Sequence, residues 1–429
     1  MELEGGPRLR ARLAPGNSGG GSRLREQRQS AFPAATLPPV ITVNGNPLLI
    51  EAIRAEIAAQ GGRITFARFM DLALYHPEWG YYHAAQRRPG RPGDFLTAPE
   101  AHPFFGITLA RQVAECWERL GQPDQFVVRE YGPGIGGLAW DIIGGLRQEN
   151  PACLTALSYE LVERNPQRMS EALAAFRDEG LGDLVRAIDP EKIAALPPMT
   201  GVILANEVAD AFPVHRLTWQ NGALREGWVV WADEGFAEEV AELSPPALAA
   251  EPASMLRAHG IALQEGDRIE ISPGAAAWFA EAAARLERGY VIVIDYGYPA
   301  EHLYQAHRLE GTVRAYRAHT VTDDPFAHVG EQDLTAHVDF TALREAGEAA
   351  GLTFAGQTNQ AAFLTSLDMG NLMVSLGQDP ETTMEEYLAA QAAVLRLIDP
   401  GGLGRFGVLL MARDAPVAPP LRGLSFPPV

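Results

Sequence analysis

The sequence predicts an α/β fold built on an open, mostly parallel sheet. From Phe126 onward, short apolar segments alternate with amphipathic helical ones. Residues 201–208 and 290–297 are nearly continuous apolar runs, which is typical of parallel strands buried on both faces. A glycine-rich turn at residues 132–137 joins the first predicted strand to a helix. Turns of this kind approach ligands closely in α/β proteins, so the same three observations also indicate a binding site.

Composition excludes several classes of function. The 429 residues include 35 Lys plus Arg and 54 Asp plus Glu, which gives a formal net charge of −19. Such an acidic chain lacks the basic surface of a general nucleic-acid binder and suits a cationic partner better. No apolar run approaches the ~20 residues of a membrane-spanning helix. With 47% apolar residues, the chain can bury a sizeable core.

The cysteines and the acidic and histidine residues do not form a metal motif. Cys116 and Cys153 lie far apart, without a CxxC pair or a companion histidine spacing. Asp333, His337 and Asp339 also lack a metal-binding spacing, so we expect a helix cap and a polar network there. We therefore predict no metal and a reducing compartment.

The N-terminal part of the chain is predicted as a tail followed by helices. Residues 1–45 are rich in Gly, Pro, Ser and Arg and have no apolar periodicity, so we expect a disordered tail. Residues 46–125 contain three helical patterns and one long loop rich in Gly and Pro. The helices are expected at 47–60, from Thr65 to Pro77, and at 104–120, and the loop at 87–100.

The predicted core is interrupted by one insertion. Residues 126–215 form its first part, with strands at 126–131, 155–163 and 201–208 and helices at 138–149 and 166–179. Residues 216–272 are the insertion, in which Asn221-Gly222 lies between two β-rich runs and predicts a hairpin. Residues 273–415 complete the core with added helices, at 339–351 and across 366–398, before a closing strand at 404–413. Residues 416–429 are predicted as a second tail.

The glycine-rich turn predicts a cofactor site. Gly132, Gly134 and Gly136 let the backbone turn tightly in front of a helix N-terminus. Glu163 ends the next strand, where an acid can accept hydrogen bonds from both ribose hydroxyls of a nucleoside. Glu130, directly before the turn, would repel a pyrophosphate but suits an ammonium or a sulfonium. S-adenosylmethionine carries both cations and no phosphate, so the turn favours this cofactor over a nicotinamide dinucleotide.

Polar residues also follow the strand at 201–208. Ligands in open α/β sheets bind beyond the carboxyl ends of the strands, so Asn206, Glu207 and Asp210 should face a crevice. We assign Asn206 to the cofactor and the two acids to a cationic acceptor. The structural alternative makes Asp210 a cap and Asn206 a turn residue. Asp94, on the loop at 87–100, is either a turn cap or a further contact to the cofactor.

Several short motifs between residues 47 and 413 resemble those of one protein family. They occur in this order: ITFARFM (64–70) with GYY (80–82), GDFLT (93–97), EYGPG (130–134), VERNP (162–166), ANE (205–207) with DA (210–211), IDYG (294–297), GTVRAY (311–316) with His319, and DLTAHVDF (333–340). The sequence resembles the MidA-like family of S-adenosylmethionine-dependent methyltransferases. This family includes the mitochondrial assembly factor of respiratory complex I. The resemblance implies a class I methyltransferase fold, which is a Rossmann-like sheet with an N-terminal helical extension and extra helices before the last strand.

The resemblance also implies the acceptor. The mitochondrial member is similar to protein-arginine methyltransferases and forms symmetric dimethylarginine on a complex I subunit. We therefore expect an arginine-bearing protein partner, with a complex I subunit as the candidate, and we allow for a homodimer. A guanidinium, whose pKa lies above ~12, needs carboxylates to orient it and accept a proton. Glu207 and Asp210 are expected in these catalytic roles. Asp94 and Asp339 are the second candidates for the same roles.

Two alternatives remain from other classes. An assembly chaperone could bind S-adenosylmethionine and hold a client subunit without catalysis. A nicotinamide oxidoreductase is disfavoured by Glu130 and by the closing C-terminal strand. The expected compartment is the cytoplasm, or the mitochondrial matrix if the source is eukaryotic.

Overall fold

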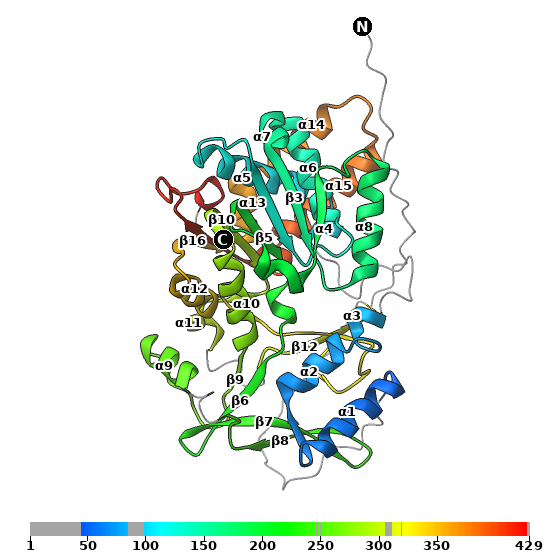
Figure 1. Ribbon diagram of the computed structural model, residues 1–429, viewed down its shortest axis with the longest axis vertical. Helices are drawn as coiled ribbons and strands as arrows, with labels where there is room; N and C mark the ends of the chain where they lie inside the picture. Colours follow the sequence, from blue (N-terminus) through cyan, green and yellow to red (C-terminus); the bar gives the residue numbers. More distant parts are fainter. Residues whose placement is uncertain are drawn as a thin grey trace, which may run out of the picture. The chain divides into compact units, whose positions relative to one another are not determined.

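A seven-stranded sheet forms the larger part of the structure, a computed structural model that describes residues 44–84, 98–245, 248, 250–304, 311–318 and 320–426. The strand order is β16–β17–β10–β5–β2–β3–β4. Only β17 runs antiparallel to its neighbours, and the other strands are mutually parallel. The bounds are β2 Phe126–Tyr131, β3 Leu157–Val162, β4 Val185–Ile188, β5 Met199–Asn206, β10 Leu286–Asp295, β16 Thr353–Asn359 and β17 Gly407–Arg413. The predicted open α/β sheet is confirmed (Figure 1).

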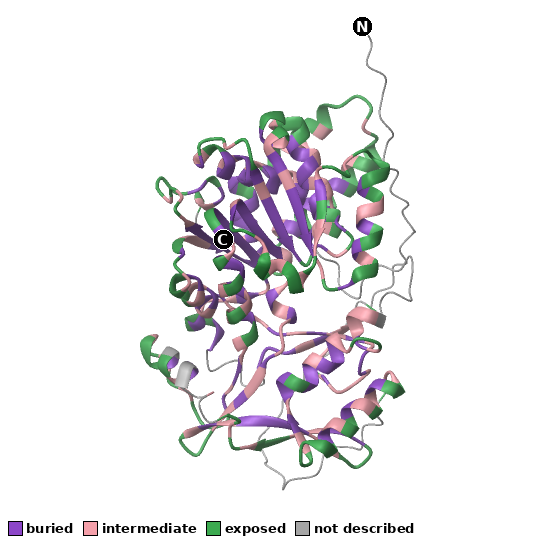
Figure 2. Ribbon diagram, viewed as in Figure 1, coloured by how far each residue is buried: buried purple, intermediate pink, exposed green. Residues whose placement is uncertain are grey.

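Helices cover both faces of this sheet, and alternate residues of each strand point to opposite cores. On β5, Val202 and Leu204 pack into one core, whereas Ile203 and Ala205 pack into the other. Figure 2 shows how continuously these strands are buried. The first core takes residues from α4 Ala98–Ala101, α5 Phe104–Arg119, α6 Gly137–Glu149, α7 Pro151–Ala156, α8 Pro166–Asp178, α13 Gln360–Ser366, α14 Met369–Gln378 and α15 Met384–Ile398. The second takes residues from α10 Pro273–Ala284 and α12 Phe340–Ala349. The sheet and these helices are called the large lobe below.

A small lobe is built from two further sheets. One has the order β1–β7–β6–β9, with β8 paired to β7, and the other has the order β13–β12–β14. Three helices from the N-terminal segment pack on them around a shared apolar core that contains Phe66 and Phe69. The elements are α1 Pro47–Ala59, β1 Arg63–Thr65, α2 Phe66–Tyr75, α3 Tyr81–Ala84, β6 His215–Gln220, β7 Ala223–Ala232, β8 Gly235–Ala241, β9 Arg268–Ile271, β12 Arg314–Arg317, β13 Thr320–Thr322 and β14 Asp333–Thr335. Residues 46–125 therefore contribute to both lobes.

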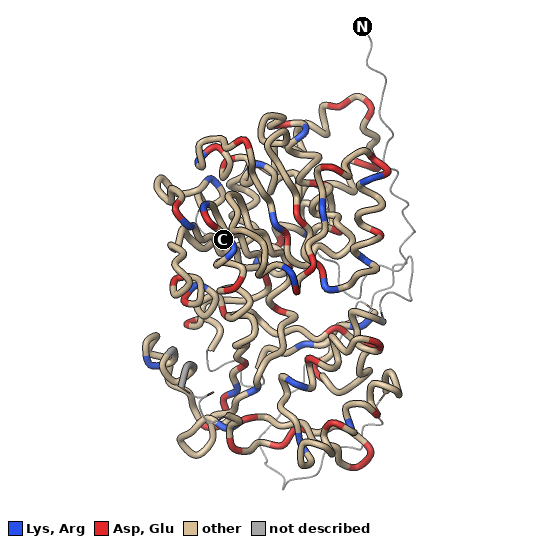
Figure 3. Tube along the Cα trace, viewed as in Figure 1, with Lys and Arg blue, Asp and Glu red and all other residues tan. Residues whose placement is uncertain are grey.

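Several short elements complete the fold. They comprise α9 Ala250–Ala258, α11 Ala300–Leu303, the pair β11 Gly297–Tyr298 and β15 Val338–Asp339, and the 3₁₀ turns η2 Pro190–Ala195, η3 Ala209–Ala211, η5 Leu403–Arg405 and η6 Arg422–Leu424. Helices α9 and α11 pack on the hairpin sheet in a fourth apolar cluster. Lys and Arg positions are scattered among the acidic ones over the described chain (Figure 3).

Local sequence explains where several elements begin. The Thr65 hydroxyl accepts from the Arg68 N–H at 3.1 Å and caps α2, as predicted. The hairpin between β6 and β7 turns at Asn221 and Gly222, which have φ angles of 53° and 75°. Both residues tolerate this left-handed region, so the pair closes the predicted hairpin.

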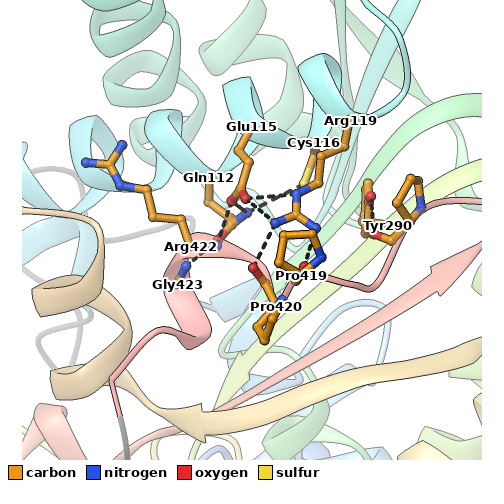
Figure 4. Close-up of polar contacts among 10 residues, drawn as sticks. Gln112, Glu115, Cys116, Arg119, Tyr290, Pro419, Pro420, Arg422 and Gly423 are labelled. Carbon is orange, nitrogen blue, oxygen red and sulfur yellow. Dashed lines mark hydrogen bonds and ion pairs between the residues drawn. The ribbon is translucent and has the colours of Figure 1, made fainter.

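Two segments differ from the expected pattern. The predicted strand at 155–163 begins at Leu157, because Thr155 and Ala156 end helix α7, which Asn150 caps and Pro151 starts. Residues 419–423, within the predicted second tail, lie along α5 (Figure 4). The Arg119 guanidinium donates to the carbonyls of Pro419 and Pro420 at 2.6 and 2.7 Å.

Candidate functional site

A cleft of about 2710 Å³ lies at the carboxyl ends of β2, β3 and β5, between the large and small lobes. It brings together most of the residues that the sequence singled out. Among them, the cleft is lined by Glu130, Gly132, Gly134, Glu163, Asn206, Glu207 and Asp210. Gly136 does not line it, and Asp94 lies outside the described residues. Asp339 is not at the cleft either: its Oδ1 caps α12 by accepting from Thr341 and Ala342.

The glycine turn has the conformation that requires glycine. Gly132 and Gly134 have φ angles of 66° and 56°, in the left-handed region. A Cβ on Gly132 would lie 2.8 Å from the side chain of Val208, whereas a Cβ on Gly134 would meet open space. Gly136 has a φ of 84° and caps α6, where an added Cβ would meet the Phe176 ring. The turn therefore brings the N-terminus of α6 to the cleft, which Gly134 and Gly137 line.

Glu130 lies at the end of β2, with its carboxyl group almost fully buried. The Tyr159 hydroxyl donates to its Oε2 at 2.7 Å. Burial raises the pKa of Glu130 to about 7, although this hydrogen bond acts in the opposite direction. A cation bound beside Glu130 would therefore favour its ionised form, whereas a phosphate would be repelled by it.

Glu163 lies at the end of β3, where the sequence predicts a ribose-binding acid. Its Oε1 accepts from the backbone N–H of Asn165 at 2.9 Å. Asn165 in turn caps α8 through Gln167 and Arg168. The carboxylate is thus held at the rim of the cleft by one oxygen, and the residue lines the cleft beside the glycine turn.

Glu207 follows β5 with a φ of 52°, which is an uncommon conformation for a non-glycine residue. Its Oε1 accepts from the Ala98 N–H at 3.1 Å and from the Asn206 Nδ2 at 3.0 Å. Burial is the main cause that raises the pKa of Glu207 to about 8. The carboxyl group is therefore poised to exchange a proton near neutral pH.

Asp295, at the end of β10, fixes the turn that carries Glu207 and Asp210. It is fully buried, and its Oδ2 accepts from the backbone N–H groups of Val208 and Ala209 at 3.0 and 2.8 Å. Burial and the negative charge of Asp295 raise the pKa of Asp210 well above its usual range. The sequence analysis assigned no role to Asp295, although its place at the end of an apolar run was an available signal.

Sequence reasoning missed the small-lobe wall of the cleft. The Tyr82 hydroxyl donates to Asp333 Oδ1 at 3.1 Å, and the Tyr75 hydroxyl donates to the Ala211 carbonyl at 2.9 Å. The rings of Tyr75 and Tyr82 stack with centroids 5.3 Å apart. All three side chains line the cleft together with Tyr316. The GYY and DLTAHVDF motifs contain Tyr82 and Asp333, but nothing local in the sequence pairs them.

The residues of the cleft fit S-adenosylmethionine. The open space at Gly134 gives room for a ligand against the glycine turn. The donor and acceptor chemistry agrees, because Glu130 and Glu163 are acids placed at the ends of adjacent strands, where a cationic amino-acid group and a ribose would be bound. No group of three or more His, Cys, Asp or Glu residues suited to a metal occurs in the described ranges, and no helix there is long and apolar enough to cross a membrane.

Comparison with known proteins identifies the same chemistry. A family model for S-adenosyl-L-methionine-dependent methyltransferases matches residues 108–358. A Burkholderia thailandensis protein assigned to the methyl transferases, with S-adenosyl-homocysteine bound in its crystal structure, is 33% identical. The match covers 88% of this chain and 94% of that one, with a TM-score of 0.76.

Two curated relatives are similar over most of their length. The human mitochondrial protein arginine methyltransferase NDUFAF7 is 28% identical over 350 residues, 76% of this chain and 75% of the relative. The Drosophila melanogaster homolog is 28% identical over 338 residues, 75% of each chain. The predicted class I fold and cofactor are therefore confirmed at the level of the family.

Proposed function

Because the chain belongs to the family of S-adenosylmethionine-dependent methyltransferases, we propose that it transfers the methyl group to an arginine side chain of a protein. The observation that carries this proposal is the pair Glu207 and Asp210 at the end of β5. Both residues line the cleft, three positions apart in the chain. The names of the curated relatives support the same acceptor.

The chemistry divides between two parts of the cleft. When bound, S-adenosylmethionine supplies an electrophilic methyl group on a sulfonium. The glycine turn, Glu130 and Glu163 bind and orient it, and Asn206 is proposed beside them. Glu207 and Asp210 orient the guanidinium, which has no available lone pair while its positive charge is delocalised. Holding the donor and acceptor in line, away from water, supplies much of the rate increase.

The proton released from the acceptor needs a base. Glu207, whose pKa is raised to about 8, accepts a proton more readily than an ordinary exposed carboxylate. Asp210 lies three residues further along the same turn, and its carboxylate helps keep the guanidinium charge away from the attacking nitrogen. These roles use only the side chains that follow β5.

The partner and compartment extend the same proposal. We propose a respiratory complex I subunit as the acceptor protein, since the family resemblance implies it and the curated relatives are named mitochondrial. The mitochondrial matrix would be the compartment in a eukaryotic source and the cytoplasm in a bacterial one. A homodimer stays a prediction.

The test is mass spectrometry of complex I subunits from cells with and without this protein. We expect an arginine carrying two methyl groups that is present only in cells with the protein. Cells that express Glu207→Gln at normal abundance serve as the matched control and should lack the mark. An unmodified set of subunits in wild-type cells would contradict the complex I acceptor. A normal mark with Glu207→Gln would contradict the assignment of the base.

A further inference from the structure

Asp210 and Asp333 come together from different lobes. The backbone N–H of Ala336, directly after β14, donates to the Asp210 carbonyl at 3.0 Å. Both aspartates line the cleft, and the charge of Asp333 contributes to the raised pKa of Asp210. Two carboxyl groups that line one cleft disfavour each other's ionisation, and a cation bound between them removes that repulsion.

Tyr82 connects this pair to the cofactor side of the cleft. Its hydroxyl donates to Asp333 Oδ1 at 3.1 Å, and its backbone carbonyl accepts from Asn165 Nδ2 at 3.1 Å. The backbone N–H of Asn165 donates to Glu163. The position of Asp333 is therefore set by a residue that is itself bonded to the turn after β3.

The aromatic wall beside these acids already accommodates a guanidinium. The Arg164 guanidinium carbon lies 5.3 Å from the centroid of the Tyr75 ring. Tyr75 stacks on Tyr82, and both residues line this part of the cleft. Planar guanidinium groups bind favourably over aromatic faces, which makes this wall suited to an arginine side chain.

One buried acceptor atom in the cleft independently indicates a ligand with N–H groups. Asn206 is 9% exposed and lines the cleft. Its Nδ2 donates to Glu207, whereas its Oδ1 is buried and has no hydrogen-bond partner among the described residues. Buried polar atoms are nearly always paired, so this oxygen suits a donor supplied by a ligand.

We propose that the small lobe completes the acceptor site, with Asp333 and Asp210 binding the arginine guanidinium jointly. The stacked rings of Tyr75 and Tyr82 form the apolar wall beside it, and Tyr82 positions Asp333. The inference rests on the arginine acceptor proposed above and extends it, because it assigns acceptor specificity to residues outside the methyltransferase sheet.

The experiment uses the full-length protein, tritium-labelled S-adenosylmethionine and protein extract from cells that lack this protein. Label in dimethylarginine is measured after hydrolysis as the extract concentration increases. Asp333→Asn should raise the apparent KM for extract protein at least tenfold, and Tyr82→Phe about threefold. The Kd for S-adenosyl-homocysteine, measured by calorimetry, should stay within twofold in both. Asp323→Asn is the matched control, since Asp323 is exposed, pairs with Arg314 and does not line the cleft.

The outcomes separate the two proposals. No labelled dimethylarginine with wild-type protein would overturn the arginine acceptor and with it this site. Wild-type activity with an unchanged KM in both Asp333→Asn and Tyr82→Phe would overturn the small-lobe site alone. If Asp333→Asn does not fold, Tyr82→Phe decides, because it keeps the ring and Asp333 and removes one hydroxyl. A merely structural Tyr82 would lower the melting temperature without raising KM.

Discussion

The Oδ2 atom of Asp295 accepts a hydrogen bond from the backbone N–H of Ala209 at 2.8 Å, and this contact joins the end of β10 to the turn after β5. The same oxygen also accepts from Val208. The pairing of β10 with β5 ends at Ile294 and Asn206. Asp295, the next residue of β10, continues the contact between the two chain segments through its side chain. The positions of Glu207 and Asp210 thus depend on a neighbouring strand as well as on their own.

Replacing Asp295 by asparagine should slow methyl transfer and shift its pH dependence. Asparagine keeps one acceptor oxygen but loses the charge, and this charge contributes to raising the pKa of Glu207. We expect the acidic limb of the kcat profile to move to lower pH and the maximal rate to fall about tenfold or more. Binding of S-adenosyl-homocysteine, measured in parallel, should change little. A pH profile that superimposes on the wild type would argue that Asp295 only stabilises the fold.

The substitution Glu163→Ala tests whether this residue binds the ribose of S-adenosylmethionine. If Glu163 binds both ribose hydroxyls, its removal should weaken S-adenosylmethionine binding by about 2–4 kcal/mol. Calorimetry of wild type and variant gives this difference directly. Glu179→Ala is a suitable control, because Glu179 is exposed at the end of α8 and does not line the cleft. Equal dissociation constants for the two variants would place the ribose acid elsewhere.

The sheet and the class of cofactor were predictable because contiguous residues indicate them. Apolar runs identify β5 and β10, and the glycine turn with Glu130 identifies the ligand chemistry. In contrast, β1, Arg63–Thr65, is too short to produce a pattern and forms only by pairing with β7. The contact between Tyr82 and Asp333 joins residues 251 positions apart. Such a contact depends on the packing of α3 against β14. No pattern of apolar residues in the neighbouring sequence predicts this packing.

Removing residues 414–429 should destabilise the protein. This deletion eliminates the hydrogen bonds from Arg119 to Pro419 and Pro420 and leaves the buried Gln112 side chain without its bond to Gly423 at 3.0 Å. Each lost bond contributes about 1 kcal/mol, so we expect the melting temperature to fall by roughly 4 °C. Deleting residues 1–40 is the matched comparison, for which we expect an unchanged melting temperature. Equal values for the two deletions would contradict the role of the C-terminal segment.

The substitution Glu207→Gln should distinguish a catalytic role of Glu207 from a role in stabilising the fold. The change removes the charge and keeps the shape, so S-adenosyl-homocysteine affinity should stay within about threefold while methyl transfer falls ~10²–10⁴-fold. The folded-state pKa of about 8 lies above the unfolded value of about 4.3. Ionising Glu207 therefore disfavours the folded state. The free energy of unfolding of the wild type should decline as the pH rises from about 4.3, the unfolded pKa, to about 8, the folded pKa.

Glutamine cannot ionise, so the variant should keep that stability. We expect Glu207→Gln to melt at a higher temperature than the wild type at pH 9 and at nearly the same temperature at pH 4. Scanning calorimetry at both pH values, on the preparation used for kinetics, measures this difference. A catalytic carboxylate predicts lost activity together with a gain of stability at high pH. A purely structural Glu207 predicts lost stability at both pH values and an unchanged rate per folded molecule, which would remove Glu207 from the acceptor site.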